Sequence, residues 1–117
     1  MNHSKIILVL AFFLVTLFGC TKAIIDEGAP NNIDRIIKYN PDIETIMFNH
    51  CITCHGGVAP SGGFTLTTYE EVRTYTEGGT LLSRVNNPAN PMPPGGLLST
   101  ENRQIIDKWV ADGLLEN

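Results

Sequence analysis

The stretch Cys51-Ile52-Thr53-Cys54-His55 decides how the rest of this 117-residue chain is interpreted. Its two cysteines lie three positions apart, and a histidine follows the second cysteine directly. Residues three apart on a helical turn point the same way. The two thiols can therefore reach one edge of a flat ligand. The histidine then lies under that ligand and can offer an imidazole nitrogen to a metal ion.

Cys-x-x-Cys-His is the attachment signature of c-type haem. We therefore predict one covalent haem c, with Cys51 and Cys54 as thioether residues and His55 as an axial ligand of the iron. A thioredoxin-like redox pair is disfavoured because the βαβ context is missing. A zinc site that adds His50 is disfavoured because four neighbours on a short segment rarely close a tetrahedron. A plain Cys51–Cys54 disulfide is the remaining alternative.

The second axial ligand is predicted to be Met92, in the segment Asn-Pro-Met-Pro-Pro-Gly-Gly. Prolines fix φ, and a stiff loop helps to hold a weak thioether ligand. His50 lies beside Cys51, on the same side of the ring as the first ligand. Met47 fits an apolar helical stripe, so we expect it in the core. His/Met ligation raises the reduction potential and suits electron transfer.

The N-terminus is predicted to be an export signal over residues 1–19. Lys5 is followed by the apolar run 6–18, which is too short for a membrane-spanning helix of about 20 residues. Leu17-Phe18-Gly19-Cys20 resembles the lipobox of bacterial lipoproteins, in which the cysteine receives a diacylglyceryl group. We expect lipid on Cys20, a tether over residues 20–32 and a monohaem domain over 33–117.

The composition excludes several classes of protein. Charged residues make up 17% and hydrophobic residues 43%, which excludes a charge-rich disordered chain. Eight Lys and Arg stand against twelve Asp and Glu, with no basic run, which argues against nucleic acid as a partner. The odd count of three cysteines is explained if two hold haem and Cys20 holds lipid.

Apolar spacing and capping residues predict an all-α domain with long loops. Asn40-Pro41 is expected to start the first helix, with Asn40 as its cap. A capping box, Thr68-x-x-Glu71, opens a helix that runs to about Thr76. The other expected elements are a short turn over 81–85, a final helix capped by Ser99 or Thr100 that runs to Asp112, and loops over 56–67 and 86–96.

The haem motif, the later Met-Pro-Pro and the closing amphipathic helix together resemble a class I cytochrome c. The Asp-Ile-x-x-Ile-Met run before the motif, His-Gly-Gly after it and Gly-Gly-Phe-x-Leu-x-x-Tyr-Glu at 62–70 more narrowly resemble the planctomycete-type cytochrome c domain. The likeness covers about residues 41–113. It implies a small cytochrome c-like helical fold whose first and last helices cross beside the haem, with Cys51, Cys54, His55 and Met92 in the roles given above.

The expected function is electron transfer between redox proteins, without enzymatic activity. We expect a lipid-anchored protein on the periplasmic face of a bacterial membrane. Thr21, where some lipoproteins carry an inner-membrane aspartate, slightly favours the outer membrane. The alternatives are a haem-based sensor or gas-binding module, and an accessory haem subunit of a respiratory complex. Trp109 is expected in the core, and Arg73 and Arg84 are expected as solvated surface charges.

Overall fold

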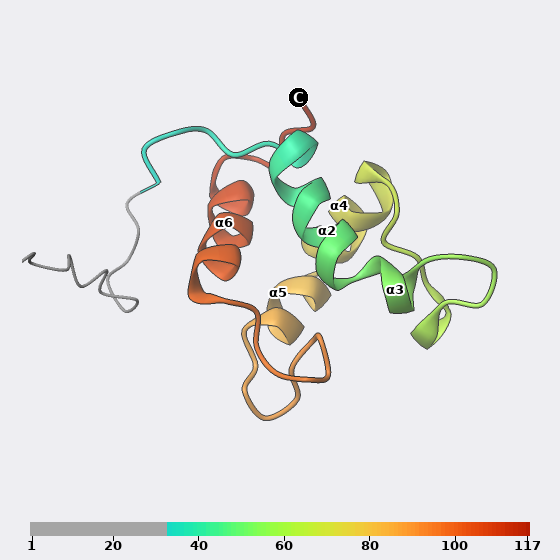
Figure 1. Cartoon of the computed structure of the whole chain (residues 1–117). Helices are drawn as coiled ribbons and strands as arrows, with labels where there is room; N and C mark the ends of the chain where they lie inside the picture. The colour runs from blue at the N-terminus through green and yellow to red at the C-terminus, as the bar shows by residue number, and fades with distance from the viewer. Residues whose placement is uncertain (1–32) are drawn as a thin grey trace, which may run out of the picture.

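The computed structural model describes residues 33–117 (Figure 1). The signal peptide expected over 1–19, the tether over 20–32 and the lipid site at Cys20 lie outside the described residues. Within the described part, helices are joined by loops and there is no β-strand. This confirms the all-α prediction.

The helical elements follow one another in short pieces, and α6 is the longest of them. In chain order they are η1 (Tyr39–Ile43), α2 (Glu44–His50), α3 (Ile52–His55), η2 (Ser61–Gly63), α4 (Tyr69–Glu77), α5 (Thr80–Val85) and α6 (Thr100–Ala111).

The final helix begins and ends as its sequence predicts. The Ser99 hydroxyl accepts a hydrogen bond from the backbone N–H of Asn102 at 3.2 Å and so caps α6. Gly113 follows the helix with a φ of +94°, a conformation that favours glycine.

The start of the first helix differs from the prediction. Asn40 is extended, with φ −100° and ψ 120°, inside the π-type turn η1, and regular α-helix begins only at Glu44. The carboxylate of Asp42 supports this turn instead of an asparagine cap. It accepts the backbone N–H of Lys38 at 3.2 Å and pairs with the guanidinium of Arg35 at 2.7 Å.

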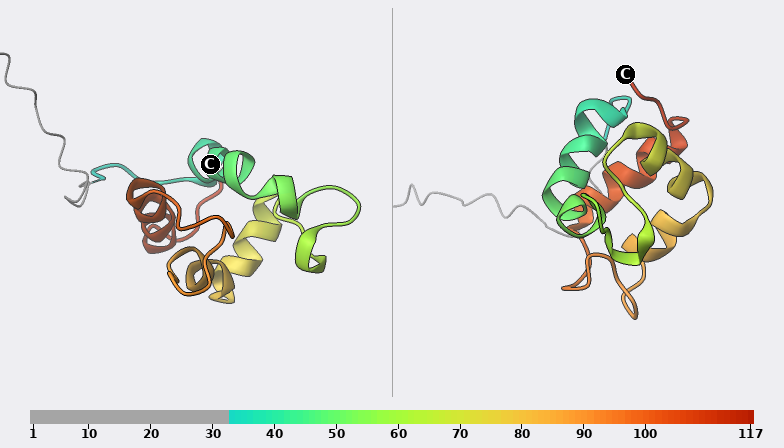
Figure 2. Two further views of the ribbon diagram at one scale, coloured as in Figure 1. Left: turned by 60° about the horizontal axis from the view of Figure 1, so that its bottom comes forward. Right: turned by 90° about the vertical axis from the view of Figure 1, so that its right-hand side faces the viewer.

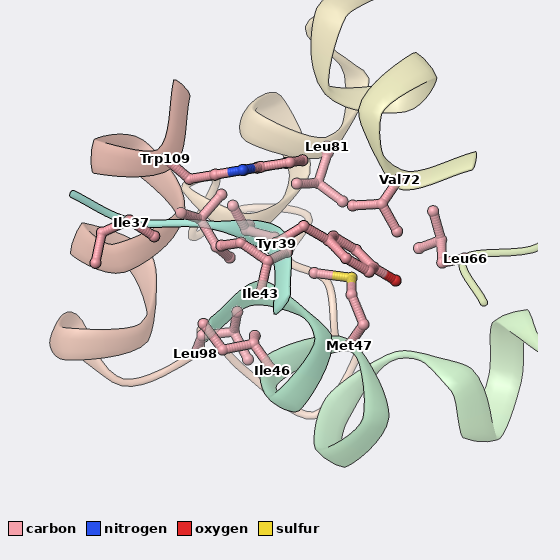
Figure 3. Close-up of a cluster of buried hydrophobic side chains, with 12 residues drawn as sticks. Ile37, Tyr39, Ile43, Ile46, Met47, Leu66, Val72, Leu81, Leu98 and Trp109 are labelled. Atoms are coloured by element: carbon pink, nitrogen blue, oxygen red, sulfur yellow. The ribbon is translucent and has the colours of Figure 1, made fainter. Parts of the chain in front are cut away.

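The core gathers between α2, α6 and the pair α4 and α5 (Figure 3). Met47 and Trp109, both expected in the core, are 1% and 0% exposed, which confirms both predictions. The buried apolar side chains are Ile37, Tyr39, Ile43, Ile46, Met47, Leu66, Val72, Leu81, Val85, Leu98, Ile106 and Trp109.

The segment that begins the first helix lies beside the C-terminal segment. The backbone N–H of Tyr39 donates to the carbonyl of Leu115 at 2.7 Å, and that of Asn40 donates to Glu116 at 3.0 Å. The indole N–H of Trp109 donates to the same Leu115 carbonyl at 2.9 Å. All three views therefore show the C-terminus beside the start of the first helix (Figures 1 and 2).

The predicted capping box at the start of α4 is confirmed and is larger than the sequence motif. The backbone N–H of Glu71 donates to the Thr68 hydroxyl, and the Glu71 carboxylate accepts the backbone N–H of Thr68. The same carboxylate also accepts the hydroxyl of Thr65 and both the N–H and the hydroxyl of Thr67. Glu71 therefore ties the segment before α4 to the helix.

These bonds make stability depend on pH through Glu71. The Thr65 hydroxyl, followed by the N–H of Thr67, lowers the pKa of the Glu71 carboxyl from 4.5 to about 2. The native chain then binds fewer protons than the unfolded chain between about pH 2 and 4.5, so stability rises with pH in that window. We expect Glu71→Gln to flatten this rise, as measured by urea unfolding at successive pH values.

Glu70→Gln is the matched control, because the side chain of Glu70 accepts none of these bonds. It should retain the wild-type pH dependence. If the unfolding free energy rises equally steeply with pH in wild type and in Glu71→Gln, the role assigned to the Glu71 carboxylate is contradicted.

Candidate functional site

A cavity of about 330 Å³ lies beside the core, within the range of volumes that hold small ligands and cofactors. Its walls come from the end of α2, from α3, from the segment 61–66, from α4 and α5, and from the loop before α6. Its lining is mostly apolar. The lining residues are His50, Cys51, Cys54, His55, Ser61, Gly62, Phe64, Leu66, Tyr75, Thr80, Leu81, Arg84, Val85, Met92, Pro93 and Pro94.

The Cys-x-x-Cys-His stretch forms the short helix α3, as its spacing predicts. The backbone N–H of Cys51 donates to Met47 at 2.9 Å, and that of His55 donates to Cys51 at 2.9 Å, so α3 continues from α2 after a bend. Cys51 is half-buried and Cys54 is exposed, and both are free thiols. The two cysteines and His55 therefore reach the cavity from one helical turn.

His55 is the member of this group with a buried polar atom that makes no hydrogen bond. Its side chain is 8% exposed, and its Nδ1 is buried without a hydrogen-bond partner. A buried polar atom without a partner costs free energy. The imidazole therefore lies on the cavity wall with no hydrogen-bond partner for Nδ1 among the described residues.

Met92 reaches the same cavity from the loop between α5 and α6. Its side chain is half-buried, and its backbone N–H donates to the carbonyl of Arg84 at 3.1 Å. Pro93 and Pro94, which follow it, also line the cavity. The structure thus brings together Cys51, Cys54, His55 and Met92, although the last is far from the others in sequence.

Of the two arginines expected as surface charges, one is placed differently. Arg73 pairs with Glu77 at 2.8 Å, and their side chains are 42% and 52% exposed. Arg84 lines the cavity instead. Its Nη2 donates to the Asn90 side chain at 3.1 Å, while its Nε is buried without a partner. Arg84 is therefore half-buried beside the cavity, so the expectation of a fully solvated charge holds only in part.

Sequence reasoning missed two aromatic members of the site, Phe64 and Tyr75. The ring of Phe64 stacks on the His55 imidazole, with ring centres 4.3 Å apart. The ring of Tyr75, on α4, packs against that of Phe64 with the same distance between ring centres. Phe64 lies in the Gly-Gly-Phe-x-Leu motif. That motif was the sequence signal from which the place of Phe64 in the site could have been predicted.

The state of the two cysteines bears on the alternative interpretations of the motif as a redox pair, a zinc site or a disulfide. Burial raises the pKa of the Cys51 thiol to about 11, whereas redox-active and metal-binding cysteines have lowered pKa values. Cys51 and Cys54 form no disulfide with each other. Over residues 33–117, no three His, Cys, Asp or Glu side chains gather in a cluster that could hold a metal ion.

In the part of the chain that the structure covers, none of the helices has both the length and the apolar character needed to cross a membrane. No protein-family model, no curated protein and no solved structure matches this chain. The residues of the cavity therefore supply the evidence for function.

Proposed function

We propose that this chain is a monohaem c-type cytochrome that passes single electrons between redox proteins. One observation carries the proposal: the four residues selected from the sequence as haem ligands and attachment points, Cys51, Cys54, His55 and Met92, line the same cavity. These residues come from two separate segments, so their meeting does not follow from the spacing of the motif.

The residues of the cavity fit a haem c. Cys51 offers a neutral thiol and Cys54 an exposed thiol, both on one helical turn. Each S–H bond would add across a vinyl group of the haem to form one C–S and one C–H bond. His55 offers a buried imidazole on the cavity wall. Met92 offers a thioether from a segment flanked by prolines. The mostly apolar lining suits a porphyrin face.

Each residue has a distinct task in this proposal. A bound haem would supply one-electron chemistry through its iron. Cys51 and Cys54 would fix its position covalently, and the side chains of His55 and Met92 would bind its iron. Leu66, Leu81 and Val85 exclude water from the cavity, and a dry site and a thioether ligand both tune the potential.

The proposal includes a small cytochrome c-like helical fold for residues 33–117. The packing of η1 against α6, with Tyr39 6.1 Å from Trp109 between ring centres, supports it, because the family brings its first and last helices together. We further propose that Cys20 carries lipid and holds the domain at the periplasmic face of a bacterial membrane, with the outer membrane slightly favoured.

Charge supports a choice of partner. Residues 20–117 contain seven Lys and Arg against twelve Asp and Glu. An acidic carrier associates fastest with a partner that presents a basic docking patch. We propose redox proteins with such a patch as donor or acceptor, and no nucleic acid.

Covalent attachment is the first prediction. The protein purified from a host that matures c-type cytochromes should retain its haem mass and colour after acid denaturation. Replacing Cys51 and Cys54 together by serine should abolish this retention, because both thioethers are lost. Mass spectrometry and a denaturing gel stained for haem measure it.

Cys20→Ser is the matched control for that experiment, since it removes the third cysteine without touching the motif. It should keep covalent haem. Complete extraction of haem from the denatured wild type would refute the proposed function.

The axial ligand gives a second test. Met92→Leu should abolish the methionine-to-iron charge-transfer band of the ferric protein, because it removes the thioether that the iron would bind. Met47→Leu, in the other methionine of the described chain, should leave the band intact, since Met47 is buried in the core. A high-spin, five-coordinate wild type would reject Met92 as a ligand and favour a gas-binding or sensor role.

The lipid anchor is tested separately. The wild-type chain should fractionate with membranes and incorporate labelled fatty acid, and Cys20→Ala should do neither, because acyl chains supply the membrane affinity. Covalent haem in both proteins would show that export is intact. A wild type without label would contradict the anchor and leave the haem proposal unaffected.

A further inference from the structure

The imidazole of His55 has no hydrogen-bond partner at Nδ1 among the described residues. A histidine that binds a metal almost always donates its other ring N–H to a carboxylate, a backbone carbonyl or a water molecule, and this bond fixes the plane of the ring. The Nδ1 of His55 is buried and has no partner among the described residues. Some other contact must therefore hold the ring.

Aromatic stacking supplies that contact. The rings of His55 and Phe64 lie 4.3 Å apart between centres, with 23° between their planes. The ring of Tyr75 packs on Phe64 at 4.3 Å and 34°. The rings from α3, the following loop and α4 thus contact one another in series, and all three residues line the cavity.

Phe64 is itself held from both sides. The backbone N–H of Leu66, two residues later, donates to the carbonyl of His55 at 2.8 Å, which joins this segment to α3. Thr65 and Thr67 donate to the carboxylate of Glu71, which joins it to α4. A side chain at Gly62 would place its Cβ 3.0 Å from the ring of Phe64, so glycine leaves room for the ring there.

We infer that Phe64 is a positioning residue that sets the plane of the His55 imidazole. This inference rests on the proposed function, in which His55 binds the iron. Phe64 touches the ligand and not the metal. It acts by fixing the rotation of the ring about its bond to the chain, the task that a hydrogen bond to Nδ1 performs elsewhere. Tyr75 backs Phe64 and limits its movement.

The test compares Phe64→Leu with Phe64→Tyr in the full chain with haem. Electron paramagnetic resonance of the ferric protein reports the imidazole plane, because the splitting of the iron d orbitals depends on it. We expect Phe64→Leu to shift and broaden the largest g value. Phe64→Tyr keeps the ring and should retain the wild-type spectrum.

Phe48→Leu is the matched control. It makes the same chemical change at a residue of α2 that is 67% exposed and does not line the cavity, so its spectrum should equal the wild type. Tyr75→Leu is a second variant for the case in which Phe64→Leu does not accumulate. It leaves Phe64 on His55 and should cause a smaller shift in the same direction.

The outcomes separate this inference from the proposed function. Covalent haem with unchanged g values in Phe64→Leu, or in Tyr75→Leu if that is the variant obtained, would overturn the positioning role and leave the cytochrome proposal standing. A lowered melting temperature with an unchanged spectrum would count as the same refutation, because it marks a purely structural role. A wild type without covalent haem would overturn both.

Discussion

The packing of Trp109 joins the start of the first helix, α4 and the C-terminal segment. The cavity depends on this packing, because α4 forms part of its wall. The indole ring of Trp109 lies against Tyr39 and Tyr69, with centres 6.1 and 6.5 Å apart, and its N–H binds the carbonyl of Leu115. One side chain of α6 thus contacts η1, α4 and the C-terminal segment. The same helix α4 also carries Tyr75, which lines the cavity. The packing of Trp109 against α4 therefore helps to fix the position of this part of the cavity wall. A domain this small has little other core on which to rely.

Core and cavity are therefore parts of one packing arrangement. Leu66, Leu81 and Val85 belong to the buried cluster and also line the cavity. An apolar cavity leaves its lining atoms without contacts on one side, which costs dispersion energy. A ligand that binds only the folded chain recovers those contacts and stabilises the fold. In the proposed cytochrome, the haem would act as the central part of the core as well as the redox group.

Local chemistry explains which predictions succeeded. The Thr68 and Ser99 caps, the helical turn at Cys51–His55 and the burial of Met47 and Trp109 depend on contacts within a few residues or on apolar periodicity, and both can be read from a sequence. The start of the first helix was misjudged at Asn40, because Asp42 and Arg35 form an alternative network around it. The place of Arg84 on the cavity wall was not predicted, because charge alone does not reveal whether a helix face borders a cavity.

The sequence by itself determined the helical class, the ends of α4 and α6, and the placing of two thiols and one imidazole on a single turn, because these features depend on short-range spacing. Only the tertiary structure decided that Met92 and Arg84 line the same cavity as His55, that Phe64 stacks on the histidine, and that Tyr75 packs on Phe64. These contacts join residues far apart in the chain. Their formation depends on how α3, α4 and α5 pack around the core, and no local pattern encodes that packing.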